Sequence, residues 1–289
     1  MALDSLPREL LLMITDYLLP TTIESLALTF NKQITLTCLP LLQRLFARRR
    51  HAKRMASMFS ADNCWRSSET IETIEQNREK LGIPATSKIG EPTESEYFTR
   101  LQYLEFKEDL HWLEPRDEKS AEIRAFSGYA LVLPLEANQL DDLRAEADAL
   151  GITIPPSFFK LFADKTLLNR LNIGRGCFAV DGGIRKVPAF IDNGNQGYSI
   201  RLSTTPLDFV HCSIYMESGN QRAHCMLGKL HDSMDEATAN EEVYLEAYSF
   251  EEWLAMTYFN VWLWYVLNYY QEPEEPLREY VRRIYVRDE

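Results

Sequence analysis

The strongest constraint on the fold is a change of period in the second half of the chain. From Cys177 onward, apolar residues come in short runs bounded by glycine, asparagine, aspartate or proline. Such spacing is typical of successive strands of an antiparallel sheet. The expected strands are Cys177–Asp181, Lys186–Ile191, Tyr198–Ser203, Phe209–Met216 and Ala223–Lys229. Asp181-Gly182-Gly183 predicts a hairpin turn, since glycine accepts the positive φ that such turns need.

Helical patterns lie on both sides of these runs. Leu135–Gly151 combines good helix formers with one apolar face and a terminal glycine. Pro155-Pro156 breaks the chain before a short aromatic helix that begins near Phe158. Ser249-Phe250-Glu251-Glu252 is a capping box for an uncharged, aromatic-rich helix over Trp253–Tyr270. A membrane span is the alternative for that helix, but its asparagines and tyrosines and its acidic flanks favour a buried helix.

The first fifty residues predict a cluster of short helices. Apolar residues recur at three- and four-residue spacing from Leu6 to Leu18, with a proline in the first turn. Leu19-Pro20 ends that helix, and Thr21–Glu24 opens a second one with a capping box. Pro40 is expected to open a longer helix that runs to Phe59. A segment this short buries little apolar surface by itself, so its surplus of leucine suggests packing on another protein.

These patterns divide the chain into three parts and define an α+β fold class. Residues 1–58 form a small helical module. Residues 59–120 form a polar connector that is partly helical and in part a candidate for disorder. Residues 121–289 form an α+β domain in which helices flank an antiparallel sheet. No repeat with a period of 20–50 residues is visible.

Charge and cysteine usage exclude several classes of protein. The net charge is −12, although residues 1–60 carry eight Lys/Arg against four Asp/Glu, and the overall acidity disfavours nucleic acid as the main ligand. The run Arg48–Arg54 could be a nuclear-localisation or phosphate-contacting segment. We favour a solvated helix face, with Leu45, Phe46, Met55 and Met58 turned inward. Five scattered cysteines and a poor signal-peptide pattern indicate a reducing compartment, the cytoplasm or the nucleus.

The N-terminal module resembles an F-box, most closely the fungal variety in which an LxLTxK stretch closes the second helix. The resemblance covers about 45 of the 289 residues and rests on Leu6, Pro7, Glu9, Leu10, Ile14, Leu18, Leu26, Leu28 and Lys32. Many F-boxes carry an aromatic residue soon after the basic one, and here Ile34 and Leu36 stand in its place. The resemblance implies a partner, the Skp adaptor of a cullin–RING ubiquitin ligase. It implies an adaptor-binding surface made of Leu6, Pro7, Glu9, Leu10, Ile14, Leu18, Leu26 and Leu28.

The second half resembles the SUKH superfamily, in the version that fungal proteins often join to an F-box. The matching phrases are Ile154–Phe158 with Phe162 and Leu167, Gly197–Leu202, Asp208–Tyr215, His224–Leu227 and Tyr248–Trp253. The chain departs from the pattern at Cys212, where an aromatic is usual, and at Ile173–Cys177, where a Cys-rich phrase is usual. The resemblance implies an α+β domain that binds a protein and carries no catalytic residues.

A metal site and a nucleophilic catalytic site have little support in the sequence. His211-Cys212 and His224-Cys225 could offer four metal ligands, but neighbouring residues on a strand point to opposite faces. No local signature marks a Cys/His nucleophilic pair. We therefore expect no catalytic residue, no metal and no cofactor.

The sequence thus predicts a non-catalytic substrate receptor of a cullin–RING ligase, whose F-box end binds the Skp adaptor and whose SUKH-like domain binds an unknown target protein. Neither nucleic acid nor membrane is an expected partner. The alternative is a free-standing SUKH-type scaffold or regulator, in which the N-terminal helices cap the chain's own fold. The first hypothesis predicts that residues 121–289 fold alone, and the second that deleting residues 1–45 destabilises the second half.

Overall fold

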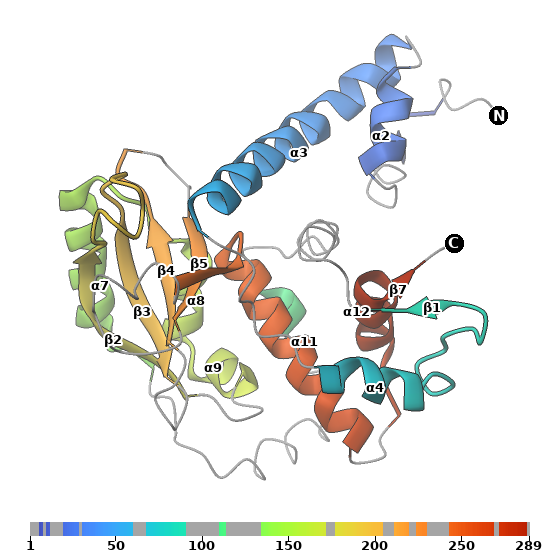
Figure 1. Ribbon diagram of the computed structural model, residues 1–289. Coiled ribbons are helices and arrows are strands. Elements are labelled where there is room, and N and C mark those ends of the chain that lie inside the picture. The colour runs from blue at the N-terminus through green and yellow to red at the C-terminus, as the bar shows by residue number, and fades with distance from the viewer. Residues whose placement is uncertain are drawn as a thin grey trace. The chain divides into compact units, whose positions relative to one another are not determined.

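The computed structural model shows a mixed helical and sheet protein made of two compact units, Met1–Met55 and Ala56–Glu289 (Figure 1). It describes residues 6–7, 10–11, 20–28, 31–59, 68–90, 110–113, 134–171, 177–204, 211–219, 224–229, 243–268 and 272–287. The first unit ends within three residues of the boundary expected at 58. The second unit begins before the predicted connector and includes it.

The N-terminal unit contains α2 (Pro20–Ala27) and most of α3 (Lys32–Met58). The prediction that the longer helix opens at Pro40 is wrong, because α3 starts eight residues earlier and carries Pro40 inside it. Asn31 supplies the helix start, since its side-chain Oδ1 accepts the amide protons of Gln33 at 3.0 Å and Ile34 at 3.1 Å. Pro40 lies at an exposed position, where the missing amide removes one helical hydrogen bond.

The C-terminal unit is built on a five-stranded antiparallel sheet in which neighbours in sequence are neighbours in space. Its strands are β2 (Cys177–Lys186), β3 (Tyr198–Thr204), β4 (His211–Met216), β5 (His224–Lys229) and β6 (Val243–Ala247). Four of the five expected strands are confirmed: Cys177–Asp181 is the first part of β2, and the other three are β3, β4 and β5. The strand β6 was not expected from the sequence.

The chain between Cys177 and Ile191 differs from the prediction. Asp181-Gly182-Gly183 does not form a hairpin turn but lies inside β2, where the pairing with β3 shifts register on both sides of Asp181. Gly182 has the positive φ of 77° that the prediction required, at an irregularity in the strand instead of at its end. The predicted strand Lys186–Ile191 is also wrong, because the residues from Ala189 onward are turns.

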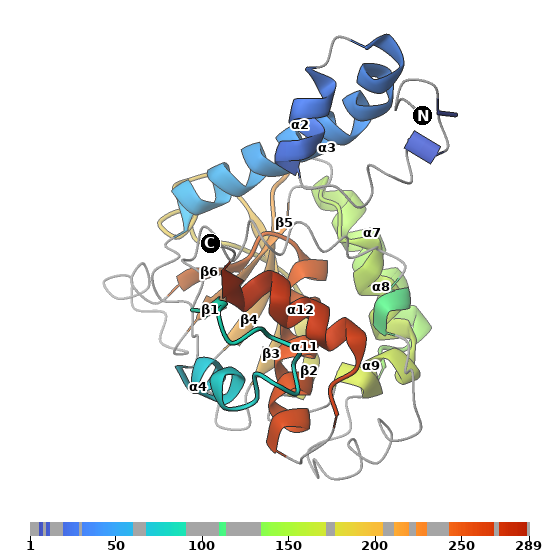
Figure 2. The ribbon, with the colours of Figure 1, turned by 90° about the vertical axis from the view of Figure 1, so that its right-hand side faces the viewer.

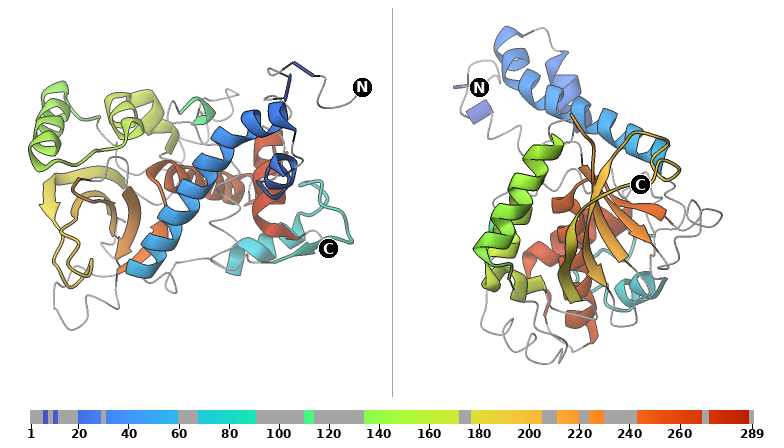
Figure 3. Two further views of the ribbon diagram at one scale, coloured as in Figure 1. Left: turned by 90° about the horizontal axis from the view of Figure 1, so that it is seen from above. Right: turned by 90° about the vertical axis from the view of Figure 1, so that its left-hand side faces the viewer.

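Helices pack one face of this sheet into the main core (Figures 2 and 3). They are α7 (Ala137–Leu150), α8 (Pro156–Ala163), α9 (Lys165–Leu171), α11 (Phe250–Asn268) and α12 (Glu275–Tyr285). The glycine stop of α7 is confirmed, since Gly151 caps it with a φ of 65°. The capping serine of α11 is confirmed too, because the Glu252 amide donates to Ser249 Oγ at 3.1 Å. In Figure 2, α12 lies against α11, and α4 (Ser68–Gln76) contacts α11 as well.

Residues 68–90 and 110–113, which the sequence assigned to the connector, contribute to the main core. Ile74, Leu81, Ile83, Leu110 and Leu113 are all buried in it. The short strand β1 (Lys88–Ile89) pairs antiparallel with β7 (Val286–Arg287), next to the last helix. This part of the chain is therefore an integral layer of the C-terminal unit, and a domain starting at residue 121 would lack it.

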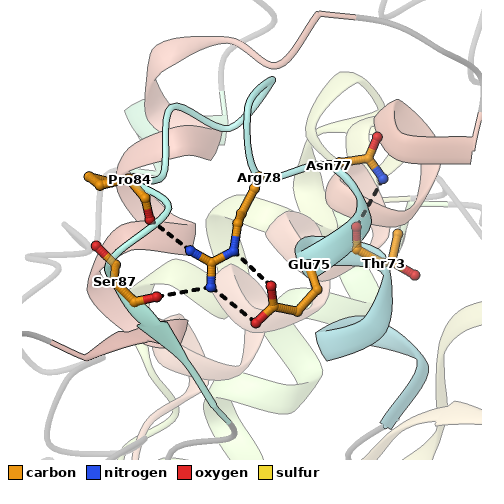
Figure 4. Close-up of polar contacts among 6 residues, drawn as sticks. All are labelled: Thr73, Glu75, Asn77, Arg78, Pro84 and Ser87. Carbon is orange, nitrogen blue, oxygen red and sulfur yellow. Dashed lines mark hydrogen bonds and ion pairs between the residues drawn. The ribbon is translucent and has the colours of Figure 1, made fainter.

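One arginine organises the loop between α4 and β1 (Figure 4). Arg78 donates from Nε and Nη2 to the two carboxylate oxygens of Glu75, at 2.7 and 3.1 Å. Its remaining donors reach the carbonyl oxygens of Pro84 at 2.7 Å and Ser87 at 2.9 Å. The planar guanidinium thus joins Glu75 of α4 to two loop carbonyl groups at once. A lysine, with one compact ammonium group, could not reproduce this arrangement.

Candidate partner-binding surface

Exposed apolar side chains are concentrated in the N-terminal unit. Across the described parts of the chain, the large apolar side chains that are exposed are Leu10, Leu28, Leu36, Leu39 and Phe46. All five lie before residue 56. Clusters of exposed apolar side chains on a soluble chain mark interaction surfaces more often than isolated ones do. This unit is therefore the candidate site for a protein partner.

The structure describes five of the eight predicted adaptor-binding residues. Leu28 is 70% exposed and Leu10 is 44% exposed. Pro7 is exposed, whereas Leu6 and Leu26 are half-buried. The other three predicted residues, Glu9, Ile14 and Leu18, lie outside the described residues. The described members thus include two leucines that their own unit leaves accessible.

Local hydrogen bonds form the start of the first predicted helix and link it to α3. The amides of Leu10 and Leu11 both donate to the Pro7 carbonyl oxygen at 3.1 Å. Gln33 Nε2 donates to the Leu6 carbonyl oxygen at 2.8 Å, and so joins α3 to the segment that carries Pro7 and Leu10. Leu11, which the sequence analysis did not single out, is the buried member of this turn.

A small core holds α2 against α3. It consists of Ile34, Cys38 and Leu42, with Ile23, Leu26 and Ala27 packed against them. Thr35 Oγ1 donates to the Ala27 carbonyl oxygen at 3.2 Å at the end of α2. Leu26 points toward this core while Leu28, two residues later, is exposed. The packing of α2 against α3 thus does not require Leu28, which stays accessible to a partner.

Side chains on α3 extend the exposed apolar surface beyond the predicted residues. Leu36 is 54% exposed and borders a hollow of about 450 Å³, whose described lining residues also include Lys32, Gln33 and Thr37. Phe46 is 45% exposed, so the expectation that it turns inward is wrong. Met55, from the same expectation, is buried and Met58 half-buried. The three- and four-residue spacing of the exposed positions could have revealed this surface from the sequence.

The C-terminal unit contains a buried polar cluster that joins three elements of the fold. Ser157 Oγ donates a short hydrogen bond to Glu251 Oε1, and His224 Nε2 lies 3.7 Å from Glu251 Oε2. Burial acts to raise the pKa of Glu251, but His224 and the Ser157 hydroxyl outweigh it and hold the pKa below its usual value. The carboxylate lies between the serine and the histidine, so the histidine is not placed to activate the serine as a nucleophile.

A second buried carboxylate anchors the turn between β2 and β3. Asp192 accepts the amide protons of Gly194 at 3.1 Å and Gly197 at 2.7 Å, and the Tyr215 hydroxyl at 3.2 Å. Burial raises the pKa of Tyr215, and the charges of Asp192 and Glu217 raise it further. A Cβ on Gly197 would lie 2.1 Å from the Tyr215 ring, so only glycine fits there. This arrangement fixes a turn and offers no reactive group.

The cysteines of the two His-Cys pairs lie on opposite faces of the sheet. Cys212 faces the main core, while Cys225 lies on the opposite face of the sheet, paired with Tyr215. Burial raises the pKa of the Cys225 thiol, which keeps it protonated and a poor nucleophile. Within the described ranges, no group of three His, Cys, Asp or Glu side chains is arranged to hold a metal ion.

Comparisons with known proteins found no relative of this chain: no family model, no curated protein and no solved structure matches it. None of the helices that the structure describes is both long enough and apolar enough to cross a bilayer.

Proposed function

We propose that this protein is a non-catalytic substrate receptor of a cullin–RING ubiquitin ligase. Its N-terminal F-box-like unit binds the Skp adaptor, and its C-terminal SUKH-like unit binds the target protein in the cytoplasm or nucleus. The observation that carries the proposal is that Leu10 and Leu28, two of the predicted adaptor contacts, are exposed in the N-terminal unit.

Burial of these leucines supplies the driving force for docking. Moving one exposed leucine side chain into an interface contributes on the order of 1.5–3 kcal/mol. A few such anchors at the centre of an interface provide most of the binding energy in protein complexes. Leu28 is suited to this role because it is 70% exposed and lies just after α2, whose own packing uses Leu26 instead.

The receptor acts by proximity. One unit attaches the chain to the ligase and the other holds the target, so that target lysines experience a high effective concentration of activated ubiquitin. No step of the chemistry takes place on this chain. The buried positions of Ser157, Glu251 and Cys225 agree with a structural role for these groups.

Capture of the Skp adaptor by purified full-length protein tests the proposal. We expect the wild-type chain to retain the adaptor, and Leu10→Ser with Leu28→Ser to abolish retention at unchanged helix content. Leu6→Ala, Pro7→Ala and Ile14→Ala should weaken it as well. The matched control is Leu36→Ser with Leu39→Ser, which removes two other exposed leucines, 54% and 44% exposed, from α3 and should leave adaptor capture intact. A wild-type chain that captures no adaptor contradicts the proposal.

A further inference from the structure

One face of α3 carries exposed side chains at a seven-residue repeat. The positions alternate in steps of three and four residues, which places them along one side of a helix with 3.6 residues per turn. All six are exposed. We name them the α3 row: Leu36, Leu39, Gln43, Phe46, Arg50 and Lys53.

The α3 row changes character along its length. Leu36, Leu39 and Phe46 make its first part apolar, and Arg50 with Lys53 makes its second part basic. The helix as a whole contains seven Lys/Arg and no Asp/Glu, within a chain whose net charge is −12. Positive charge is therefore concentrated on this helix, against the balance of the rest of the chain.

The N-terminal unit does not use this face for its own packing. Ile34, Cys38 and Leu42 lie on the other side of α3 and form the small core with α2. From Phe46 to Arg50 every residue of the helix is exposed. Helices depend on tertiary packing for most of their stability, and like charges four residues apart, such as those of Arg50 and Arg54, oppose helix formation. An acidic partner would stabilise this stretch.

We propose that the α3 row binds an amphipathic helix of a partner protein, with apolar residues at a seven-residue repeat and acidic residues at one end. Steps of three and four residues are the spacing of a helix–helix seam. The hollow of about 450 Å³ beside Leu36 provides a place for an apolar side chain of the partner helix. The partner's carboxylates pair with Arg50 and Lys53, which also steer its approach.

Other occupants fit the row less well. A membrane surface calls for a broad apolar face, and Gln43 interrupts this narrow one. A nucleic acid would match Arg50 and Lys53 but leave the apolar half uncovered. A second copy of the chain would bring like charges together. The α3 row lies on a different face of α3 from the residues that pack against α2, and it does not include Leu10 or Leu28, on which the proposed adaptor docking depends.

The test uses the full chain and a designed peptide roughly three heptads long. The peptide has leucine at the first and fourth position of each heptad and glutamate at the flanking positions of one end, and carries a fluorophore for anisotropy titration. A second peptide has lysine in place of every glutamate. A DNA duplex and phosphatidylserine vesicles are titrated in parallel. The variants are Leu39→Ser with Phe46→Ser, Arg50→Glu with Lys53→Glu, and a control of equal charge change, Lys165→Glu with Lys186→Glu.

We expect the acidic peptide to bind wild type and the control equally, and both α3 variants about tenfold or more weakly. The lysine peptide should bind the Arg50→Glu, Lys53→Glu variant more tightly than it binds wild type. An acidic peptide that fails to bind, or that binds all variants alike, overturns the proposal. The proposal is also overturned if wild type binds the DNA or the vesicles more tightly than the acidic peptide and the Arg50→Glu, Lys53→Glu variant loses that binding. We expect the same variants to capture the adaptor normally. Failure of the α3-row proposal can therefore be distinguished from failure of the proposed adaptor binding.

Discussion

A buried carboxylate is stable only where its charge is compensated, and Glu251 shows how this chain achieves it. The residue is 7% exposed and lies in the first turn of α11. The Ser157 hydroxyl donates to one carboxylate oxygen and His224 lies beside the other. The positive end of the α11 dipole adds to this stabilisation of negative charge. Three elements distant in sequence, α8, β5 and α11, are thus joined through one residue.

The Glu251→Gln variant should be less stable than wild type by about 1–3 kcal/mol at pH 7, because it loses a charge-assisted hydrogen bond in a buried site. The pKa of Glu251 in the fold lies below its usual value of 4.5. Its contribution is therefore fully present above about pH 4.5 and is lost as pH falls through the folded pKa. Urea unfolding from pH 7 to pH 3 should show the difference between variant and wild type shrinking. The exposed control Asp148→Asn should show no such trend, and a pH-independent difference for Glu251→Gln would contradict this account.

At the scale of elements, sequence patterns located those whose signals are local. Gly151 ends α7 and Ser249 caps α11 as expected, because a cap depends on a few neighbouring residues. The register shifts in β2 depend on its pairing with β3, which a local pattern does not contain. The motif Asp181-Gly182-Gly183 therefore predicted the positive φ of Gly182 correctly but not its position inside a strand. Asn31 begins α3 and overrides the local signal of Pro40. At the candidate site, the accessibility of Leu28 and Phe46 depends on which helix faces pack together.

The core contribution of the 68–113 layer, of which residues 68–90 and 110–113 are described, was hidden because its composition is polar between a few apolar residues. Their burial leads to a prediction about fragments that differs from the one made from sequence. Residues 121–289 should not unfold cooperatively, because they lack Ile74, Leu81 and Leu113, each contributing on the order of 2–5 kcal/mol. Ala56–Glu289 should give a single cooperative transition in urea. In that longer fragment, Ile74→Ala should be less stable by about 2–4 kcal/mol. The exposed Glu72→Ala should change stability by less than about 0.5 kcal/mol. A cooperative 121–289 fragment would show that the 68–113 layer is dispensable.

At the scale of the whole molecule, the two units differ in how many large apolar side chains they leave exposed. The C-terminal unit buries its large apolar side chains in a continuous core that extends from Ile74 to Tyr285. In the described part of the N-terminal unit, the cluster that joins α2 to α3 has three buried residues, and the unit carries the exposed leucines. A partner that binds the folded unit adds to its stability by mass action. In the proposed function, this asymmetry separates attachment to the ligase from holding of the target.

Adaptor binding should therefore protect one unit and leave the other unchanged. With adaptor at about one hundred times its dissociation constant, mass action stabilises the bound unit by about 2.7 kcal/mol. Hydrogen exchange of the full chain should then slow at the amides of α2 and the first half of α3. Exchange in α11 and β4 should stay as it is, because the main core does not contact the adaptor in the proposed arrangement. Leu10→Ser with Leu28→Ser should remove the protection. Equal slowing in both units would contradict this account, because it would show that adaptor binding also stabilises the C-terminal unit.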